Sequence, residues 1–328
     1  MPAAAESLAT AGHTTTKNMQ IFTNTNIDFV AKSRIAAITS LLLIAVSVGS
    51  LAVRGLNFGI DFTGGTLVEV GYPRSVELGD VRSHLRQGGF GEAVVQYFGT
   101  SRDVLIRLAP RAEANNAQIS IEVLRALRAS ADNKPEVRRV EFVGPQVGDE
   151  LREDGGLAVL IALGAIFIYV LLRFEWRFSA GAVAALFHDV IITLGFFSVS
   201  GMEFDLTVLA AILAVIGYSL NDTIVVFDRI RENFRKIRKG DSSEVINVAT
   251  NQTLSRTVLT SFTTLLVVMA LLIFGGKIIH GFATALCVGI LVGTYSSIYV
   301  ASMMALRLGV SRADLMKLPK EGKVDDRP

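Results

Sequence analysis

Six long apolar runs constrain this chain more than any other feature of its sequence. Each run carries few charges and is close to the roughly 20 residues that an α-helix needs to cross a bilayer. Of the 328 residues, 51% are hydrophobic and 19% are charged. A soluble domain can be this apolar, but not with several such runs. We therefore predict a polytopic α-helical membrane protein with six spans: Ile35–Val53, Gly155–Leu172, Phe178–Ser200, Leu206–Phe227, Thr257–Phe274 and Gly281–Leu306.

The placement of lysine and arginine predicts the orientation. Basic residues gather between the fourth and fifth spans, in the turn between the second and third, and after the sixth. The turn 201–205 has none, and the turn 275–280 has only Lys277. By the positive-inside rule both termini are then cytoplasmic, and the long segment 54–154 is external whatever its own charge. We expect a cytoplasmic N-terminal segment at 1–34, spans at 35–53 and within 155–308, a cytoplasmic loop at 228–256 and a cytoplasmic tail at 309–328.

The external segment is long enough for one small domain. Alternating and helical patterns predict the order β-α-β-β-α-β, which is that of a ferredoxin-like α+β sandwich. The predicted elements are a strand at Thr66–Tyr72, a helix at Val76–Gln87, strands at Ala93–Phe98 and Val104–Leu108 around a Gly99–Asp103 turn, a helix at Ala117–Ala129 and a strand at Val137–Val143. Its one histidine, His84, lies on a charged helix and is interpreted as solvated. A binding or leverage role suits this domain better than catalysis.

Asp222 is the acid that interrupts the fourth apolar run, between Asn221 and Thr223. An ionisable side chain at that depth costs about 2.5–3.5 kcal/mol on insertion scales, so intramembrane carboxyl groups are functional candidates by default. Arg256, at the start of the fifth span, precedes a run of hydroxyl residues that includes Thr260. An Asp222–Arg256 pair, or a chain of hydroxyl groups between them, fits the antiparallel direction of the two spans.

Two interpretations of this pair are open. Desolvation favours a neutral carboxyl group, whereas a nearby guanidinium favours the carboxylate. If the two groups approach and separate, Asp222 can load and release a proton, and one charge moving through 100 mV is worth about 2.3 kcal/mol. The alternative is a static ion pair that only fastens two helices. Asn221, together with Tyr218 and Ser219, is a candidate hydrogen-bond partner of the acid, or an ordinary interhelical contact.

His188 and Asp189 lie side by side in the third span. Adjacent helical residues face about 100° apart, which predicts that the two side chains do not share one narrow site. For Asp189, a relay role and a packing role are equally supported, and His188 is the weaker candidate.

The basic segment Arg229–Lys239 continues the fourth span, with Ile230, Phe234 and Ile237 on an apolar face. This pattern predicts an interfacial amphipathic helix in contact with lipid headgroups, and contact with a cytoplasmic partner is the alternative.

Several motifs resemble the SecF members of the SecD/SecF family, which is related to the resistance-nodulation-division transporters. The motifs are LNFGIDFTGGTLVEV (Leu56–Val70), FHDVIITLG (Phe187–Gly195), AAILAVIGYSLNDTIVVFDRIRENFRK (Ala210–Lys236) and SRTVLTSFTTLL (Ser255–Leu266). The resemblance covers about Ile27 to Leu308.

The resemblance implies a subunit that assists proton-motive-force-driven preprotein translocation through the SecYEG channel, in the bacterial inner membrane. The implied partners are SecD as an obligate partner, SecYEG, YajC, the translocating preprotein and membrane lipid, with no nucleic acid. Asp222 and Arg256 match family positions linked to proton conduction, and Asp189 matches the histidine–aspartate element. The FTGGT motif, with Phe62, Gly64, Gly65 and Thr66, is expected to shape the entry to the external domain, because glycine allows unusual backbone angles.

Two other functions fit parts of this sequence. The first is a half-unit of a small-molecule or lipid exporter of the same superfamily, but such pumps carry about twice as many spans. The second is an intramembrane aspartyl protease that uses Asp189 and Asp222. The Tyr-Asp and Gly-x-Gly-Asp motifs of those enzymes are absent, since the residues here are His188-Asp189 and Leu220-Asn221-Asp222. The sequence also has no phosphate-binding loop, no metal-ligand spacing and no nucleophile–base constellation, so we expect no enzymatic activity, no cofactor and no metal site.

Overall fold

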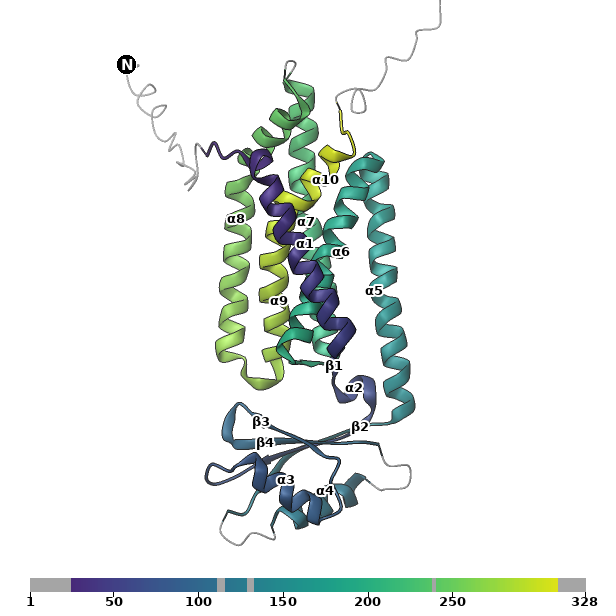
Figure 1. Ribbon diagram of the computed structural model, residues 1–328, viewed down its shortest axis with the longest axis vertical. Helices are drawn as coiled ribbons and strands as arrows, with labels where there is room; N and C mark the ends of the chain where they lie inside the picture. Colours follow the sequence, from purple (N-terminus) through teal and green to yellow (C-terminus); the bar gives the residue numbers. More distant parts are fainter. Residues whose placement is uncertain (1–24, 111–115, 129–132, 238–239, 312–328) are drawn as a thin grey trace, which may run out of the picture.

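Six helices are long and apolar enough to cross a membrane within the described residues, as the sequence predicts. The computed structural model describes residues 25–110, 116–128, 133–237 and 240–311. The spanning helices are α1 (Phe29–Arg54), α5 (Pro145–Arg173), α6 (Trp176–Ser200), α7 (Leu206–Lys236), α8 (Ser242–Phe274) and a sixth formed by α9 (Gly276–Ser296), the π-helical segment η1 (Ser297–Ala301) and α10 (Ser302–Arg307). They form a bundle with a small sheet domain at one end, and α1 begins and α10 ends at the opposite end (Figure 1).

Acidic side chains cap the starts of two spanning helices. Asp28 accepts a hydrogen bond from the backbone N–H of Ala31 at the start of α1, ahead of the predicted span, and Asp205 accepts one from Val208 at the predicted start of α7, both at 2.8 Å. Each acid thus pairs an N–H that the first helical turn leaves free. The segment 228–256, predicted as a cytoplasmic loop, is mostly helical, since α7 continues to Lys236 and α8 starts at Ser242.

The apolar face of the basic segment that ends α7 is covered by protein. Ile230 and Phe234 are buried in the same apolar cluster as Val245 and Ile246 of α8. The prediction that this segment continues the fourth span is confirmed. The apolar face does not lie in the lipid as it would in an interfacial helix, because the start of α8 folds back along it. Contact of the charged face with lipid headgroups stays a prediction. Lys239 lies outside the described residues.

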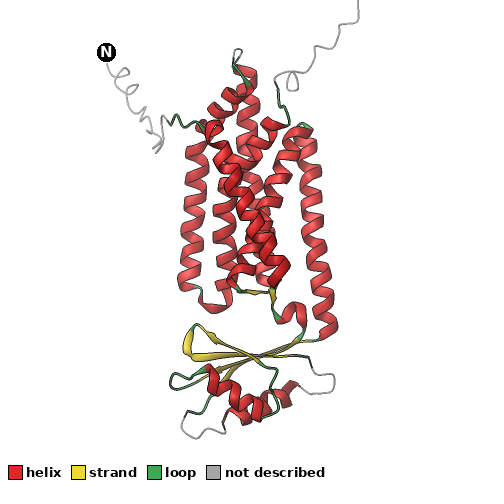
Figure 2. Ribbon diagram, in the orientation of Figure 1, coloured by secondary structure: helices red, strands yellow, loops and turns green. Residues whose placement is uncertain are grey.

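The sheet domain has the predicted β-α-β-β-α-β order, and its strands and helices lie in separate layers (Figure 2). Its elements are β2 (Gly65–Gly71), α3 (Leu78–Gln87), β3 (Val94–Phe98), β4 (Thr100–Leu108), α4 (Asn116–Leu127) and β5 (Glu136–Val143). The strands are antiparallel in the order β3-β4-β2-β5, so the ferredoxin-like prediction is confirmed. The predicted turn at Gly99–Asp103 is too long. Gly99, at φ 78°, reverses the chain almost alone, and β4 starts at Thr100. Ala129, the predicted end of the second helix, lies outside the described residues.

The sheet lies between the bundle and the helices α3 and α4 (Figure 1). Side chains alternate across a strand, and β4 follows this rule. Val104 and Ile106 are fully buried in the core beneath α3 and α4, together with Val81 and Leu85. The intervening Leu105 belongs to another cluster, with Ile60 at the bundle side of the domain. One sheet face thus forms the domain core and the other faces the bundle.

The FTGGT motif connects bundle and sheet through the short helix α2 (Ile60–Thr63). Gly64 and Gly65 have φ values of 66° and 124°, which favour glycine. A Cβ on Gly64 would lie 2.7 Å from Pro145 Cα, and one on Gly65 would lie 2.4 Å from the carbonyl oxygen of Leu108. No other residue fits these two positions without backbone movement.

Phe62 and Thr66 are buried on either side of this glycine pair. The ring of Phe62 contacts Phe58 of β1 (Asn57–Phe58) and Phe204 of β6 (Glu203–Phe204), and these two short strands pair in parallel. The motif therefore joins three segments at the end of the bundle that carries the sheet domain.

Candidate functional site

Asp222 lies where α7, α8 and the sixth span meet. Its Oδ1 accepts a hydrogen bond from Thr257 Oγ1 of α8 at 2.6 Å. Its Oδ2 accepts one from Ser297 Oγ at 2.5 Å. The carboxyl group of the predicted site therefore has two hydroxyl donors from two other helices.

Ser297 is the first residue of the π-helical segment η1. Ser302 Oγ donates to the carbonyl oxygen of Ser297 at 3.0 Å, and Ser297 Oγ also contacts the carbonyl oxygen of Thr294 at 3.0 Å. A π-turn widens the backbone locally and is frequent at functional sites. Here it falls at the residue that contacts the intramembrane acid.

Arg256, Asn221 and Thr260, the residues predicted around Asp222, do not contact its carboxyl group. Arg256 is exposed, and no ion pair joins it to Asp222 among the described residues, although the two groups interact electrostatically through space. Thr257 faces the acid, and its neighbour Arg256 lies about 100° around the helix. Asn221 and Thr260 are exposed on α7 and α8. The static ion pair weighed from the sequence is thus not the arrangement in this structure.

Asp189 forms a second polar cluster and is fully buried. Its Oδ2 accepts hydrogen bonds from Ser219 Oγ of α7 at 2.6 Å and from Ser296 Oγ of α9 at 2.7 Å. Its Oδ1 lies 2.9 Å from Nδ1 of His188. The carboxyl group is thus held by three neighbours inside the bundle.

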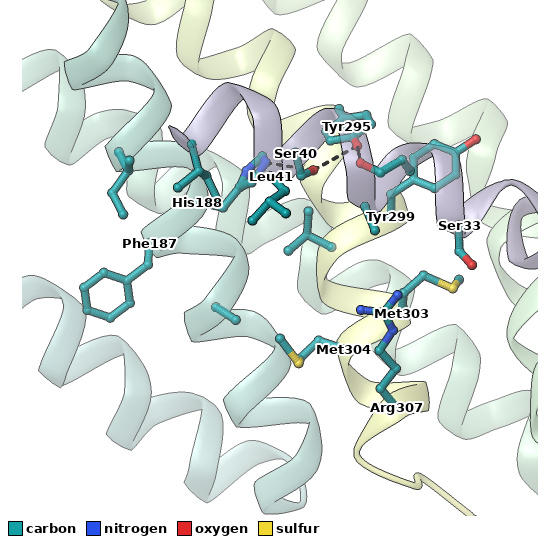
Figure 3. Close-up of a pocket in the computed structure, with 16 residues that line it drawn as sticks. Ser33, Ser40, Leu41, Phe187, His188, Tyr295, Tyr299, Met303, Met304 and Arg307 are labelled. Atoms are coloured by element: carbon teal, nitrogen blue, oxygen red, sulfur yellow. Dashed lines mark hydrogen bonds between the residues drawn. The ribbon is translucent and has the colours of Figure 1, made fainter. Parts of the chain in front are cut away.

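His188 extends this cluster toward α1. Its Nε2 lies 3.1 Å from Ser40 Oγ, which is 2.9 Å from the hydroxyl of Tyr295, and that hydroxyl donates to the carbonyl oxygen of Ala36 at 2.7 Å (Figure 3). The expectation that His188 and Asp189 do not share a site is wrong. Their Cβ atoms diverge, but the imidazole is long enough to place one nitrogen on the neighbouring carboxylate and the other on Ser40.

The two clusters meet on adjacent residues of the sixth span. Ser296 binds Asp189 and Ser297 binds Asp222. Sequence reasoning missed both serines. The signal that could have found them is the polar run Thr294-Tyr295-Ser296-Ser297, which interrupts the sixth apolar run just as Asp222 interrupts the fourth.

The described residues hold no group of three or more His, Cys, Asp or Glu side chains that could bind a metal ion. The groups at the Asp222 site are its carboxyl group and two hydroxyl groups. Hydroxyl groups both donate and accept hydrogen bonds, so they can serve a carboxyl group in either protonation state.

Comparison with known proteins identifies the family. The family model described as "Protein export membrane protein SecD/SecF, C-terminal" matches residues 123–311, and the "SecD/SecF GG Motif" model matches residues 49–72. The chain belongs to the SecD/SecF family. The second match covers the FTGGT motif, and the first covers α6, α7, α8 and the sixth span, which are the helices that contribute to the two polar clusters apart from α1.

Curated relatives match over most of the chain. The protein translocase subunit SecF of Vibrio alginolyticus is 53% identical over 92% of this chain and 97% of its own length. The SecF subunit of Pseudomonas aeruginosa is 50% identical over 92% of this chain and 98% of its own length. The family resemblance is thus confirmed for SecF in particular, and these relatives are named as translocase subunits and not as enzymes.

Solved structures confirm the fold. The crystal structure of SecDF, a translocon-associated membrane protein from Thermus thermophilus, matches with a TM-score of 0.79 and 42% identity over 87% of this chain. SecDF in a "Super-membrane-facing form" gives a TM-score of 0.65 at 41% identity. This chain covers 39% of the SecDF chain in both cases. It is a multi-pass membrane protein with the fold of one part of SecDF.

Proposed function

We propose that this chain works as the SecF subunit of a SecD–SecF complex and assists preprotein translocation through SecYEG, driven by the proton motive force. The observation that carries the proposal is the environment of Asp222. A carboxyl group at membrane depth is held by two hydroxyl groups, and the nearby cation Arg256 does not neutralise it by direct contact.

This arrangement suits reversible protonation. When Asp222 is charged, Thr257 and Ser297 donate to it; when it is neutral, its own O–H can donate to one of these hydroxyl oxygens. Approach of Arg256 would favour the charged form and its withdrawal would favour proton uptake. The membrane potential supplies about 2.3 kcal/mol per charge and 100 mV.

The partner and orientation belong to the same proposal. The family match to SecD/SecF and the 39% coverage of SecDF support a SecD partner for the remaining part. SecYEG, YajC and the preprotein are proposed as further partners. The basic residues at the bundle end opposite the sheet domain support an inner-membrane protein with both termini in the cytoplasm and the sheet domain in the periplasm.

Replacement of the acid tests the proposal. Asp222→Asn keeps the shape and the hydrogen-bonding capacity of the side chain but cannot carry a proton. We expect gradient-stimulated export into inverted vesicles to fall to the rate seen without a gradient, with SecD binding retained. Asp228→Asn is the matched control, because Asp228 lies on the same helix and pairs with Arg173 outside the site. Normal gradient-stimulated export by Asp222→Asn would refute the proton-binding role.

A further inference from the structure

A groove opens between α1, α6 and the η1–α10 end of the sixth span (Figure 3). Its volume is about 460 Å³, within the roughly 300–1,000 Å³ of small-molecule sites. Leu41 and Ile44 of α1, Phe187 of α6, and Met303 and Met304 of α10 line it. Its walls are therefore mostly hydrocarbon and thioether groups.

The polar groups at the inner end of the groove are already paired. Ser40, His188 and Tyr295 bond to one another and to Asp189 and the backbone of Ala36. A polar ligand would have to break these bonds without gaining better ones, since an unpaired buried polar group is costly. The interior of the groove thus favours an apolar chain.

The groove carries a cation at the end of α10. Arg307 lines it, is exposed, and makes no hydrogen bond or ion pair among the described residues. Lys32 and Arg34 are exposed near the start of α1, which lies at the same end of the bundle (Figure 1). Basic pockets between membrane helices are typical sites for anionic headgroups.

The groove also borders the outer surface of the bundle. Ile35 and Ile38 of α1 are 70% and 69% exposed, which is the exposure expected of a helix that faces hydrocarbon. A lipid can therefore enter from the side of α1, with its chain along the groove and its headgroup at the helix ends.

We propose that this groove is a binding site for one anionic phospholipid, with an acyl chain between α1, α6 and α10 and the phosphate at Arg307. The apolar interior selects the chain and Arg307 selects the negative charge. The site is separate from the Asp222 carboxyl group, so it does not depend on the proposed proton-binding role.

Native mass spectrometry of the detergent-purified protein, alone and with its SecD partner, tests the proposal. The probes are phosphatidylglycerol and phosphatidylcholine with identical acyl chains. We expect one tightly bound phosphatidylglycerol. Arg307→Gln should weaken it about fivefold, since one basic residue near anionic lipid is worth about 1 kcal/mol, and leave phosphatidylcholine unchanged. Ala184→Phe, which fills the groove from α6, should remove both lipids.

Arg235→Gln is the matched control, because Arg235 is an exposed base on the same side of the membrane, outside the groove. Equal weakening by Arg235→Gln and Arg307→Gln would overturn the proposal, because it would show only general surface attraction. The absence of a preference for phosphatidylglycerol, or loss of the lipid on assembly with SecD, would also overturn it.

Discussion

Asp222 and Asp189 are both carboxyl groups inside the bundle, but their surroundings suit different roles. Asp189 is fully buried and is held by Ser219, Ser296 and His188. Asp222 is only partly buried and has two hydroxyl donors. Asp222 is less buried than Asp189 and has fewer hydrogen-bond partners, and both differences suit a group that exchanges protons.

Thr257 and Ser297, the two hydroxyl donors to Asp222, should each support part of the gradient-stimulated export. Thr257→Val and Ser297→Ala each remove one hydrogen bond, and a bond to a charged group is worth about 1.5–3 kcal/mol. We expect each change to lower gradient-stimulated export about tenfold or more, and the double change to lower it further. The measurement is the export rate in inverted vesicles at a fixed gradient.

Thr263→Val is the control for this pair. Thr263 is on α8 like Thr257, but among the described residues its hydroxyl bonds only to the carbonyl oxygens of Leu259 and Thr260. If Thr263→Val impairs export as much as Thr257→Val does, the contact with Asp222 is not what matters.

The sequence identifies Asp222 as a candidate residue but does not identify the residues that hydrogen-bond to it. Asp222 stands out because an acid within an apolar run has few structural explanations. Ser297 does not stand out, since a serine in a membrane helix can bond to the backbone of its own helix. The direction of the Ser297 side chain also depends on the π-turn that begins at this residue. Arg256 was the expected partner because charge is easier to recognise than a hydroxyl group, yet Thr257 is the residue that faces α7.

Helix packing is set by glycines at the crossing of α7 and α9. A Cβ on Gly289 would lie 2.3 Å from Cγ2 of Val215, and one on Gly293 would lie 3.1 Å from Cβ of Ser219. Small residues let two helix backbones approach closely in a membrane. The close approach brings Ser219 and Ser296 onto the same carboxyl oxygen of Asp189.

Substitution of these glycines should separate the two helices. We expect Gly289→Leu to destabilise the protein by about 1–3 kcal/mol or more, the usual range for overpacking. Thermal unfolding in detergent measures this effect. Gly217→Leu is the matched control, because a Cβ on Gly217 meets nothing within 4 Å. Equal losses for the two variants would show that helix propensity, and not the crossing, determines the effect.

The sheet domain is fastened to the bundle by charged side chains on the bundle-facing side of β4. Arg107 forms an ion pair with Glu203 of β6 at 2.5 Å. Asp103 forms one at 3.0 Å with Lys277, whose ammonium group also lies 4.5 Å from the centre of the Phe98 ring. These contacts join segments that are far apart in the sequence and fix how the domain sits on the helices.

The two contacts should respond differently to acid. The hydrogen bond from Thr100, together with Lys277 and Arg138, lowers the pKa of Asp103 below its usual 3.8. Burial raises the pKa of Glu203 above its usual 4.5, against the opposing charge of Arg107. As the pH falls, Glu203 takes up a proton first and the Arg107 contact weakens, while the Lys277 contact persists.

The stabilisation from Asp103 has a defined pH window. Because its folded pKa is depressed, the contribution is fully present above the ordinary carboxyl value and is lost as the pH falls through the lower folded value. The measurement is the distribution of distances between spin labels at Arg86→Cys and Phe274→Cys, with Cys287 replaced by alanine. We expect this distribution to stay narrow from neutral pH to about pH 5. Asp103→Asn should broaden the distribution at every pH in that range. An unchanged distribution in that variant would show that Lys277 does not hold the domain.

The placement of the domain could not be predicted from the sequence. The order of strands and helices follows from local patterns, which is why the ferredoxin-like fold was predicted correctly. Asp103, Arg107 and Lys277 each resemble ordinary solvated charges when read locally. Their importance arises only once the sheet lies against the bundle, and nothing in their own sequence neighbourhood indicates it.

The glycine pair at the start of β2 has a practical consequence for engineering. Gly65 is the register partner of Val143, and Gly64 packs against Pro145 at the start of α5. The chain therefore enters and leaves the sheet domain at neighbouring points. A segment with adjoining ends can be exchanged for its counterpart from another bacterium without altering linker length, so residues 65–143 form a natural cassette for building chimeric proteins.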